Sequence, residues 1–284
     1  MRNRRPVIAA LLTAATMVSA AALAAAALQG RGTPAAGDSV PGGTRSAHPA
    51  HLAADAAALA PPAKPAFTVA TPRPLRLSSR VSMWAPVILP TVARARPRAR
   101  AHIVARVSTR TPEGTTNILL ALGVRRDATH RLWVHVRLPI LPNNTTGWVR
   151  RAALGGYRFV RTRLVVDLHS LEATLYRGRK AVFHAPVGVG ARGTATPVGR
   201  FYIRDRLTRY ASPFYGPIAF GTSARSPVLT DWPAGGYIGI HGTNHPKLIP
   251  GRVSHGCIRL RNADIHRLAT LMPIGTPVTI EPGR

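Results

Sequence analysis

Residues 254–260 read SHGCIRL and residues 240–244 read IHGTN, and these two segments decide how we interpret the chain. They place His241, His255 and Cys257 within 17 residues, and Cys257 is the only cysteine. A free thiol, with a pKa of about 8.5, is mostly protonated at neutral pH, so a nucleophilic cysteine needs an adjacent base. We therefore predict that Cys257 is a nucleophile and that His241 is the general base that activates it.

Gly256 and the backbone around it favour the same chemistry. Without a side chain, Gly256 lets a substrate carbonyl approach closely, and the N–H groups of Gly256 and Cys257 are predicted to face the developing oxyanion. If the imidazole of His241 and the thiol share a proton as an ion pair, the pKa of Cys257 should lie well below that of a free thiol.

The motif around Cys257 resembles the L,D-transpeptidase catalytic domain, also called the YkuD family. Three features carry this likeness: a strand-end His-Gly, the SHGCIRL segment and an Asn-x-Asp helix start at residue 262. TPVGRF at 196–201 resembles the family's TPxGxF segment, and GTPV at 275–278 resembles its last strand. The resemblance extends over residues 157–284.

The resemblance implies a role for each motif residue. Cys257 is expected to be the nucleophile, His241 its base, and Gly242 the source of a carbonyl that orients His241. Ser254 and His255 are expected to shape the loop and the substrate site. Arg259 stands where some members have Asn, and a carboxylate-binding role is the hypothesis for it.

The reaction that the resemblance implies is transfer between peptidoglycan stem peptides through a cysteine acyl-enzyme, giving 3→3 cross-links. With water as acceptor the protein would be an L,D-carboxypeptidase, and with a catalytically inactive site it would be a cell-wall-binding protein. His241, His255 and Cys257 could instead ligate zinc, but their spacing matches no paired-ligand pattern. We predict neither metal nor cofactor.

The region that carries the motif is predicted to be mostly β, a sandwich or barrel-like domain over residues 157–284. Strands are expected at 164–168, 173–177, 181–189, 199–205, 237–241 and 277–280. One amphipathic helix is predicted to begin with Asn262 as N-cap, to bury Ile265, Leu268, Ala269 and Met272, and to end before Pro273.

A second, smaller β unit is predicted at residues 86–154. Short runs with period two at 103–107, 118–122 and 131–138 indicate half-buried strands, and turn residues separate them. The run LWVHV at 132–136 followed by TGWV at 146–149 resembles the end of a bacterial SH3-like barrel.

The N-terminal part is predicted to direct export. Arg2, Arg4 and Arg5 precede 22 residues without a charge, Val7–Leu28, so residues 1–28 are either a cleaved signal peptide or an uncleaved membrane anchor. Residues 29–85 are rich in Ala and Pro and are predicted to be an unstructured linker. The folded part is therefore expected outside the membrane, with membrane contact only through the N-terminal segment.

The charge of the chain indicates an anionic partner. Lys and Arg total 39 against 10 Asp and Glu, a formal net charge of +29, and all the cations except Lys64, Lys180 and Lys247 are arginines. Nucleic acid and an anionic envelope are equally good partners by charge. The export segment favours cell-wall polymers and argues against nucleic acid.

Overall fold

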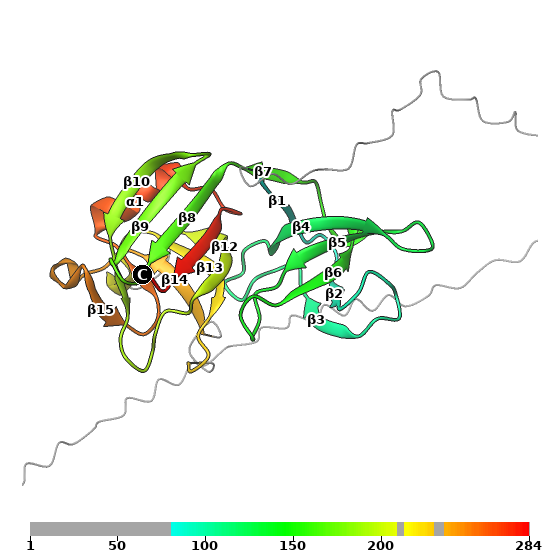
Figure 1. The fold of residues 1–284 in the computed structure, drawn as a ribbon, viewed down its shortest axis with the longest axis horizontal. Coiled ribbons are helices and arrows are strands. Elements are labelled where there is room, and N and C mark those ends of the chain that lie inside the picture. Colours follow the sequence, from blue (N-terminus) through cyan, green and yellow to red (C-terminus); the bar gives the residue numbers. More distant parts are fainter. Residues whose placement is uncertain (1–80, 209–212, 230–235, 284) are drawn as a thin grey trace, which may run out of the picture. The chain divides into compact units, whose positions relative to one another are not determined.

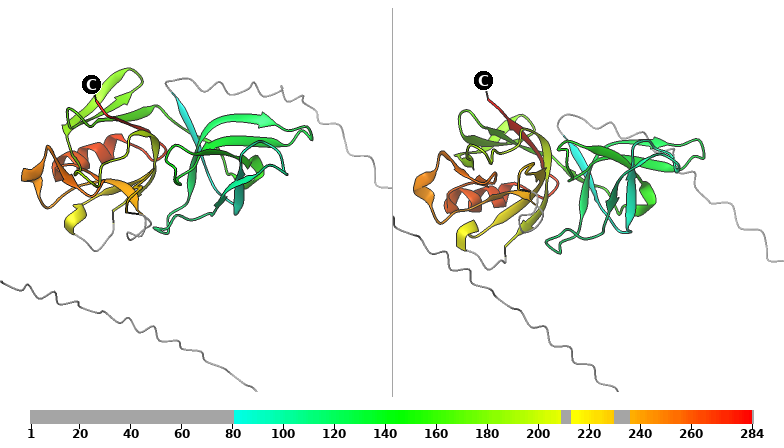
Figure 2. Two further views of the ribbon diagram at one scale, coloured as in Figure 1. Left: turned by 60° about the horizontal axis from the view of Figure 1, so that its bottom comes forward. Right: turned by 90° about the horizontal axis from the view of Figure 1, so that it is seen from below.

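The computed structural model describes residues 81–208, 213–229 and 236–283. The predicted export segment and most of the predicted linker lie outside the described residues. Both folded parts are mostly β, as expected from the sequence (Figures 1 and 2).

The N-terminal part is a seven-stranded sheet with the order β3-β2-β6-β5-β4-β1-β7. Its strands are β1 (Ser82–Pro86), β2 (Thr91–Arg94), β3 (Ile103–Val107), β4 (Ile118–Arg126), β5 (Leu132–Arg137), β6 (Thr146–Arg150) and β7 (Arg158–Val160), with a 3-10 turn at Arg151–Ala153. Every pairing in it is antiparallel. The SH3-like resemblance remains a prediction for this sheet.

Two predicted boundaries of this part are wrong. β1 begins at Ser82, within the range assigned to the linker, and Met83, Trp84 and Ala85 are buried. β7 was assigned to the following domain but pairs with β1 through Trp84 and Arg158. The short SMWAP run carries too little periodicity to be recognised, because what makes it a strand is its pairing with β4 and β7, both distant in sequence.

The C-terminal part is a ten-stranded sheet with the order β10-β9-β8-β17-β12-β13-β14-β16-β11-β15. Its strands are β8 (Thr162–Asp167), β9 (Glu172–Arg177), β10 (Lys180–Pro186), β11 (Gly188–Gly190), β12 (Gly199–Leu207), β13 (Ala219–Arg225), β14 (Tyr237–His241), β15 (Gly251–Ser254), β16 (Ile258–Arg259) and β17 (Pro277–Glu281). Short 3-10 turns occur at Pro213–Tyr215 and Pro246–Leu248. β12 pairs with β17 through its first half and with β13 through its second half, so it links two halves of the sheet.

The α-helix of the described residues, α1 (Asn262–Leu271), packs on this sheet. Ile265, Leu268 and Ala269 are buried in the same apolar cluster as residues of β8, β12 and β14, as the helical period predicts. The helix ends before Pro273, as expected, but Asn262 is not an N-cap: it is the first helical residue, and its side chain bonds elsewhere. Among the described residues no helix is long and apolar enough to cross a membrane.

Candidate active site

β14 and β16 bring the predicted base and nucleophile together. The two strands are parallel neighbours, with His241 opposite Arg259, so His241 at the end of β14 lies close to Cys257, which directly precedes β16. Gly239 of β14 lies close to both side chains. Its N–H donates to Cys257 Sγ at 3.3 Å, and a Cβ added there would lie 3.6 Å from His241 Cδ2 and 3.8 Å from Cys257 Sγ. Thiol and imidazole therefore converge over the same glycine.

His241 is held in one orientation by its surroundings. It is 2% exposed, and its Nδ1 lies 2.6 Å from the carbonyl oxygen of Gly242. A carbonyl accepts only, so Nδ1 carries the proton and Nε2 is left as the basic nitrogen. Asn262 Oδ1 accepts the N–H of Thr243 at 2.9 Å and fixes the turn that follows the histidine.

The electrostatics differ from the expected ion pair. Burial lowers the pKa of His241 to about 4. The hydrogen bond with Gly242 O acts to raise this pKa, and the charge of Arg259 acts to lower it further. Burial raises the pKa of Cys257, although the Gly239 N–H and Arg259 partly oppose it. At neutral pH the free protein therefore holds a neutral imidazole beside a neutral thiol. The expectation of a depressed thiol pKa is wrong, because desolvation outweighs the two groups that favour the thiolate.

The loop before Cys257 is fixed by hydrogen bonds among its own residues. Ser254 Oγ donates to Cys257 O at 2.6 Å and accepts the N–H of Gly256 at 3.1 Å. The N–H of Gly256 is thus already bonded, contrary to the expectation that it faces an oxyanion, and the Cys257 N–H is the remaining candidate donor. Gly256 has φ +113°, and a Cβ would meet Ile238 Cδ1 at 2.9 Å, so only glycine fits this position.

Residues in and just before the TPVGRF segment also bond to this loop. The buried hydroxyl of Thr196 donates to Gly256 O at 2.8 Å and accepts the N–H of Gly190 at 2.9 Å. Thr194 Oγ1 donates to Ser254 O at 3.2 Å. The nucleophile loop is therefore tied to β11 and to the segment before β12.

The remaining predicted site residues differ in burial. His255 is exposed, whereas Arg259 is 6% exposed, with its guanidinium carbon 4.7 Å from the centre of the Phe214 ring. Arg259 Nε finds no hydrogen-bond partner within the described part of the chain. The Tyr215 ring meets the His241 ring edge-on, 4.8 Å between centroids. The described residues contain no group of three or more His, Cys, Asp or Glu side chains placed to hold a metal ion.

Sequence reasoning missed the supporting residues. Gly239 bonds Cys257 Sγ through its backbone N–H and, having no side chain, leaves room beside His241, and neither feature leaves a mark in a motif. Asn262 was predicted to cap the start of the helix because Asn is a common N-cap residue, so its bond to Thr243 was not foreseen. Thr196 was recognised only as part of a family segment, because its hydrogen bond to Gly256 O joins residues 60 positions apart in the sequence.

Comparison with known proteins gives the family. A family model for the L,D-transpeptidase catalytic domain matches residues 161–280. YkuD of Bacillus licheniformis is 37% identical over 120 residues, which cover 42% of this chain and 66% of that protein. YqjB of Bacillus subtilis is 31% identical over 125 residues, covering 41% of this chain and 69% of that protein. Both are named as L,D-transpeptidases.

A solved L,D-transpeptidase from Mycobacterium smegmatis is similar over 54% of this chain and 91% of its own, at 14% identity and a TM-score of 0.35. The match to Bacillus licheniformis YkuD leaves slightly more than a third of that relative uncovered. The family-model match at residues 161–280 lies on the ten-stranded part, which holds Cys257, His241 and the loops that fix them. Over residues 161–280 the chain therefore belongs to the L,D-transpeptidase catalytic domain (YkuD) family.

Proposed function

We propose that the protein is a peptidoglycan L,D-transpeptidase that forms 3→3 cross-links through an acyl-enzyme on Cys257. The observation that carries the proposal is the convergence of His241 and Cys257 over Gly239, with Nδ1 of the histidine directed to Gly242 O. This arrangement leaves Nε2 as the base for the thiol.

In the first half-reaction Cys257 Sγ attacks the carbonyl carbon of the diamino acid at position three of a tetrapeptide stem while its proton passes to His241 Nε2. The Cys257 N–H is the candidate donor to the oxyanion. The C–N bond to the terminal D-alanine then breaks, His241 returns the proton to the departing amine, and a thioester remains. Because thiol and imidazole are both neutral at rest, proton transfer accompanies attack.

In the second half-reaction the side-chain amine of a neighbouring stem attacks the thioester carbonyl. His241 takes the amine proton and returns it to the sulfur, so an amide forms and the Cys257 thiol is regenerated. The buried charge of Arg259, beside both reactive groups, stabilises negative charge on sulfur and disfavours protonated His241. A carboxylate of the stem is the ligand that would pair with it.

Muropeptide analysis tests the proposal. Incubation with a tetrapeptide disaccharide should release D-alanine and yield a 3→3 dimer, and Cys257→Ser and His241→Gln should each lower the rate by at least about a hundredfold. His184→Gln, an exposed histidine of β10, is the matched control and should keep the wild-type rate. Tripeptide without dimer would identify an L,D-carboxypeptidase, and an unchanged tetrapeptide would identify a wall-binding protein without this activity.

An anionic cell-wall polymer is the partner proposed for the N-terminal sheet. The N-terminal sheet and its loops carry two carboxylates. Glu113 pairs with Arg204, and Asp127 accepts hydrogen bonds from Trp133 Nε1 and Thr129. The exposed arginines of this sheet are Arg96, Arg98, Arg100, Arg106, Arg110, Arg125, Arg126, Arg131 and Arg158. None of them forms an ion pair with another described residue.

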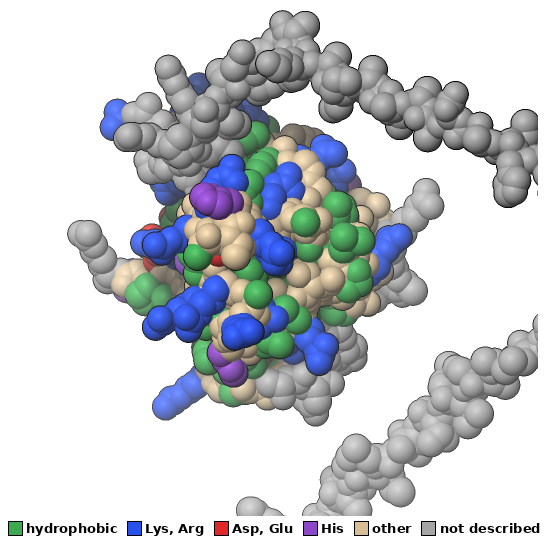
Figure 3. Space-filling view, turned by 90° about the vertical axis from the view of Figure 1, so that its right-hand side faces the viewer, with side chains coloured by type: hydrophobic (Ala, Val, Ile, Leu, Met, Phe, Trp, Pro, Cys, Tyr) green, Lys and Arg blue, Asp and Glu red, His purple; other side chains and the backbone are tan. Residues whose placement is uncertain are grey.

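Figure 3 shows one face of the molecule with many Lys and Arg side chains and very few acidic ones. Such a face attracts a polymer of phosphate or carboxylate groups over a range set by ionic strength. The predicted export segment supports a location outside the membrane, where the wall supplies this polymer and nucleic acid is not the expected partner.

A further inference from the structure

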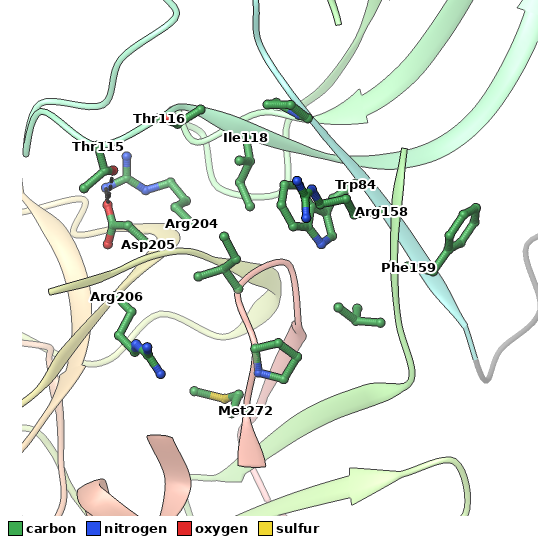
Figure 4. Close-up of a pocket in the computed structure, with 14 residues that line it drawn as sticks. Trp84, Thr115, Thr116, Ile118, Arg158, Phe159, Arg204, Asp205, Arg206 and Met272 are labelled. Atoms are coloured by element: carbon green, nitrogen blue, oxygen red, sulfur yellow. Dashed lines mark hydrogen bonds and ion pairs between the residues drawn. The ribbon is translucent and has the colours of Figure 1, made fainter. Parts of the chain in front are cut away.

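A buried guanidinium lies where the N-terminal sheet meets the catalytic part. Arg204 of β12 is 1% exposed, and its Nη2 is 3.0 Å from Glu113 Oε1, on the loop between β3 and β4. Asp205 Oδ2 lies 3.9 Å from the same nitrogen. A groove of about 1150 Å³ opens beside this cluster, and Figure 4 shows Arg204 and Asp205 near Thr115 on its wall. Because a buried charge requires a partner, Glu113 is the group from the N-terminal sheet that holds Arg204 in place.

Arg204 in turn holds the first residue of β14. Its guanidinium carbon is 3.8 Å from the centre of the Tyr237 ring, a cation–π contact at short range. The Tyr237 hydroxyl donates to the carbonyl oxygen of Pro139, in the loop between β5 and β6, at 3.1 Å. Tyr237 is therefore held by the N-terminal sheet directly through Pro139 and indirectly through Glu113 and Arg204.

The strand beside β14 is fixed by the same loop. Asn143 Nδ2 donates to Arg225 O at 2.7 Å, and Asn143 Oδ1 accepts the N–H of Arg225 at 3.0 Å. Arg225 ends β13 and is paired with Tyr237 of β14. One side chain of the N-terminal sheet thus bonds both backbone groups of a residue adjacent to β14.

From Arg204 a short path leads to the nucleophile. Arg204 Nε donates to Thr222 O at 2.9 Å, and Thr222 Oγ1 donates to Ile238 O at 2.6 Å. The next residue, Gly239, donates its N–H to Cys257 Sγ, and His241 follows two residues later on the same strand. The position of β14 therefore sets the position of both groups that act on the thiol.

We propose that Glu113 and Tyr237 are positioning residues, through which the N-terminal sheet holds β14 so that the Gly239 N–H and His241 face Cys257. The inference rests on the proposed role of Cys257, but it concerns how the strand is held and not which substrate is used. The N-terminal sheet is then a structural part of the catalytic site. Reaction rates fall steeply when reacting groups are displaced, by about a hundredfold for 1 Å.

The test uses the full chain and three variants. Glu113→Ala removes the partner of Arg204, Glu113→Gln keeps an oxygen acceptor without the charge, and Tyr237→Phe removes only the bond to Pro139. Glu172→Ala is the matched control, since Glu172 pairs with His184 on the exposed β9–β10 hairpin. Circular dichroism and thermal unfolding establish that each variant is folded.

The first measurement is alkylation of Cys257 by iodoacetamide between pH 6 and 10, which needs no peptidoglycan. Glu113→Ala should move the midpoint of the rate to higher pH, because the Gly239 N–H that favours the thiolate is displaced. The second measurement is kcat and KM with the tetrapeptide. Glu113→Ala should lower kcat about tenfold and leave KM within about twofold, and Tyr237→Phe should lower kcat several-fold. Glu113→Gln, which restores the hydrogen-bond acceptor but not the charge, should recover only part of the loss in kcat.

Wild-type alkylation profiles in folded Glu113→Ala and Tyr237→Phe would overturn the inference, and so would a loss confined to KM. If Glu113→Ala does not fold, Tyr237→Phe decides, because it leaves the ring and the contact with Arg204 in place. Absence of any reaction with the tetrapeptide in the wild type would count against the proposed function alone, since the alkylation profiles would still report the position of β14.

Discussion

At the scale of single residues, the neutral state of Cys257 governs how the thiol reacts. Burial raises its pKa, so in the free protein the thiolate fraction should increase through and above pH 8.5 instead of reaching a plateau near neutrality. We expect the rate of alkylation by iodoacetamide, followed by intact mass, to show a midpoint above that of N-acetylcysteine measured in parallel. A plateau between pH 6 and 7.5 would indicate a resting ion pair and would contradict the neutral state.

His241 should make the stability of the fold depend on pH. Its pKa is about 4 in the folded protein and about 6.5 when unfolded, so the folded state binds fewer protons between these values. The contribution of His241 to the free energy of unfolding is fully present above pH 6.5 and is lost as the pH falls through 4. Its size is about 3 kcal/mol.

Urea unfolding at pH 7 and pH 4 measures this contribution. The wild type should lose about 3 kcal/mol more than His241→Gln on going to pH 4. Gly123→Ala in β4, which removes no titratable group and has open space around it, should lose as much as the wild type. Equal losses in the wild type and His241→Gln would show that the imidazole is not buried in its neutral form.

At the scale of elements, β14 supplies the site from its backbone as well as from His241. A methyl group at Gly239 would lie 3.6 Å from His241 Cδ2, 3.8 Å from Cys257 Sγ and 3.6 Å from Phe220 O, all ordinary contact distances. Gly239→Ala should therefore fold with a free energy of unfolding within about 1 kcal/mol of the wild type. The methyl group would contact both the base and the nucleophile.

We expect Gly239→Ala to lower the rate of D-alanine release by at least about tenfold. The measurement pairs thermal unfolding with the release assay, and Gly123→Ala, a glycine of β4 with open space around it, is the control. Wild-type turnover in Gly239→Ala would mean that thiol and imidazole do not meet over this residue.

At the scale of the whole molecule, the arginines of the N-terminal sheet are expected to carry wall binding. Binding to isolated sacculi should weaken steeply as salt rises past physiological ionic strength, where the screening length is about 8 Å. Replacing Arg96, Arg98 and Arg100 with Gln should weaken binding more than replacing Arg161, Arg177 and Arg179, exposed arginines of the catalytic part.

The two triple variants remove the same charge, so the comparison separates a local surface from the net charge of the chain. Equal losses of sacculus binding in the two triple variants would indicate that binding depends on the net charge of the chain and not on a local surface. Preference for a DNA duplex over sacculi at physiological salt would identify nucleic acid as the partner instead.

The family and the β-rich character of the chain followed from its sequence alone. SHGCIRL and the strand-end His-Gly are local signals, and the predicted ranges of β3 and β14 agree with the structure because each strand carries its own pattern. The helix was found for the same reason, since its apolar residues repeat with the helical period.

Only the tertiary structure decided how the site is held and how it is charged. β1 and β7 are strands because distant partners pair with them, and Asn262 bonds to Thr243 instead of capping its helix. The neutral state of His241 and Cys257 depends on how much water the fold removes from them, which no spacing in the sequence measures. Glu113 and Arg204 lie 91 residues apart, and their contact exists only because the N-terminal sheet packs against β12.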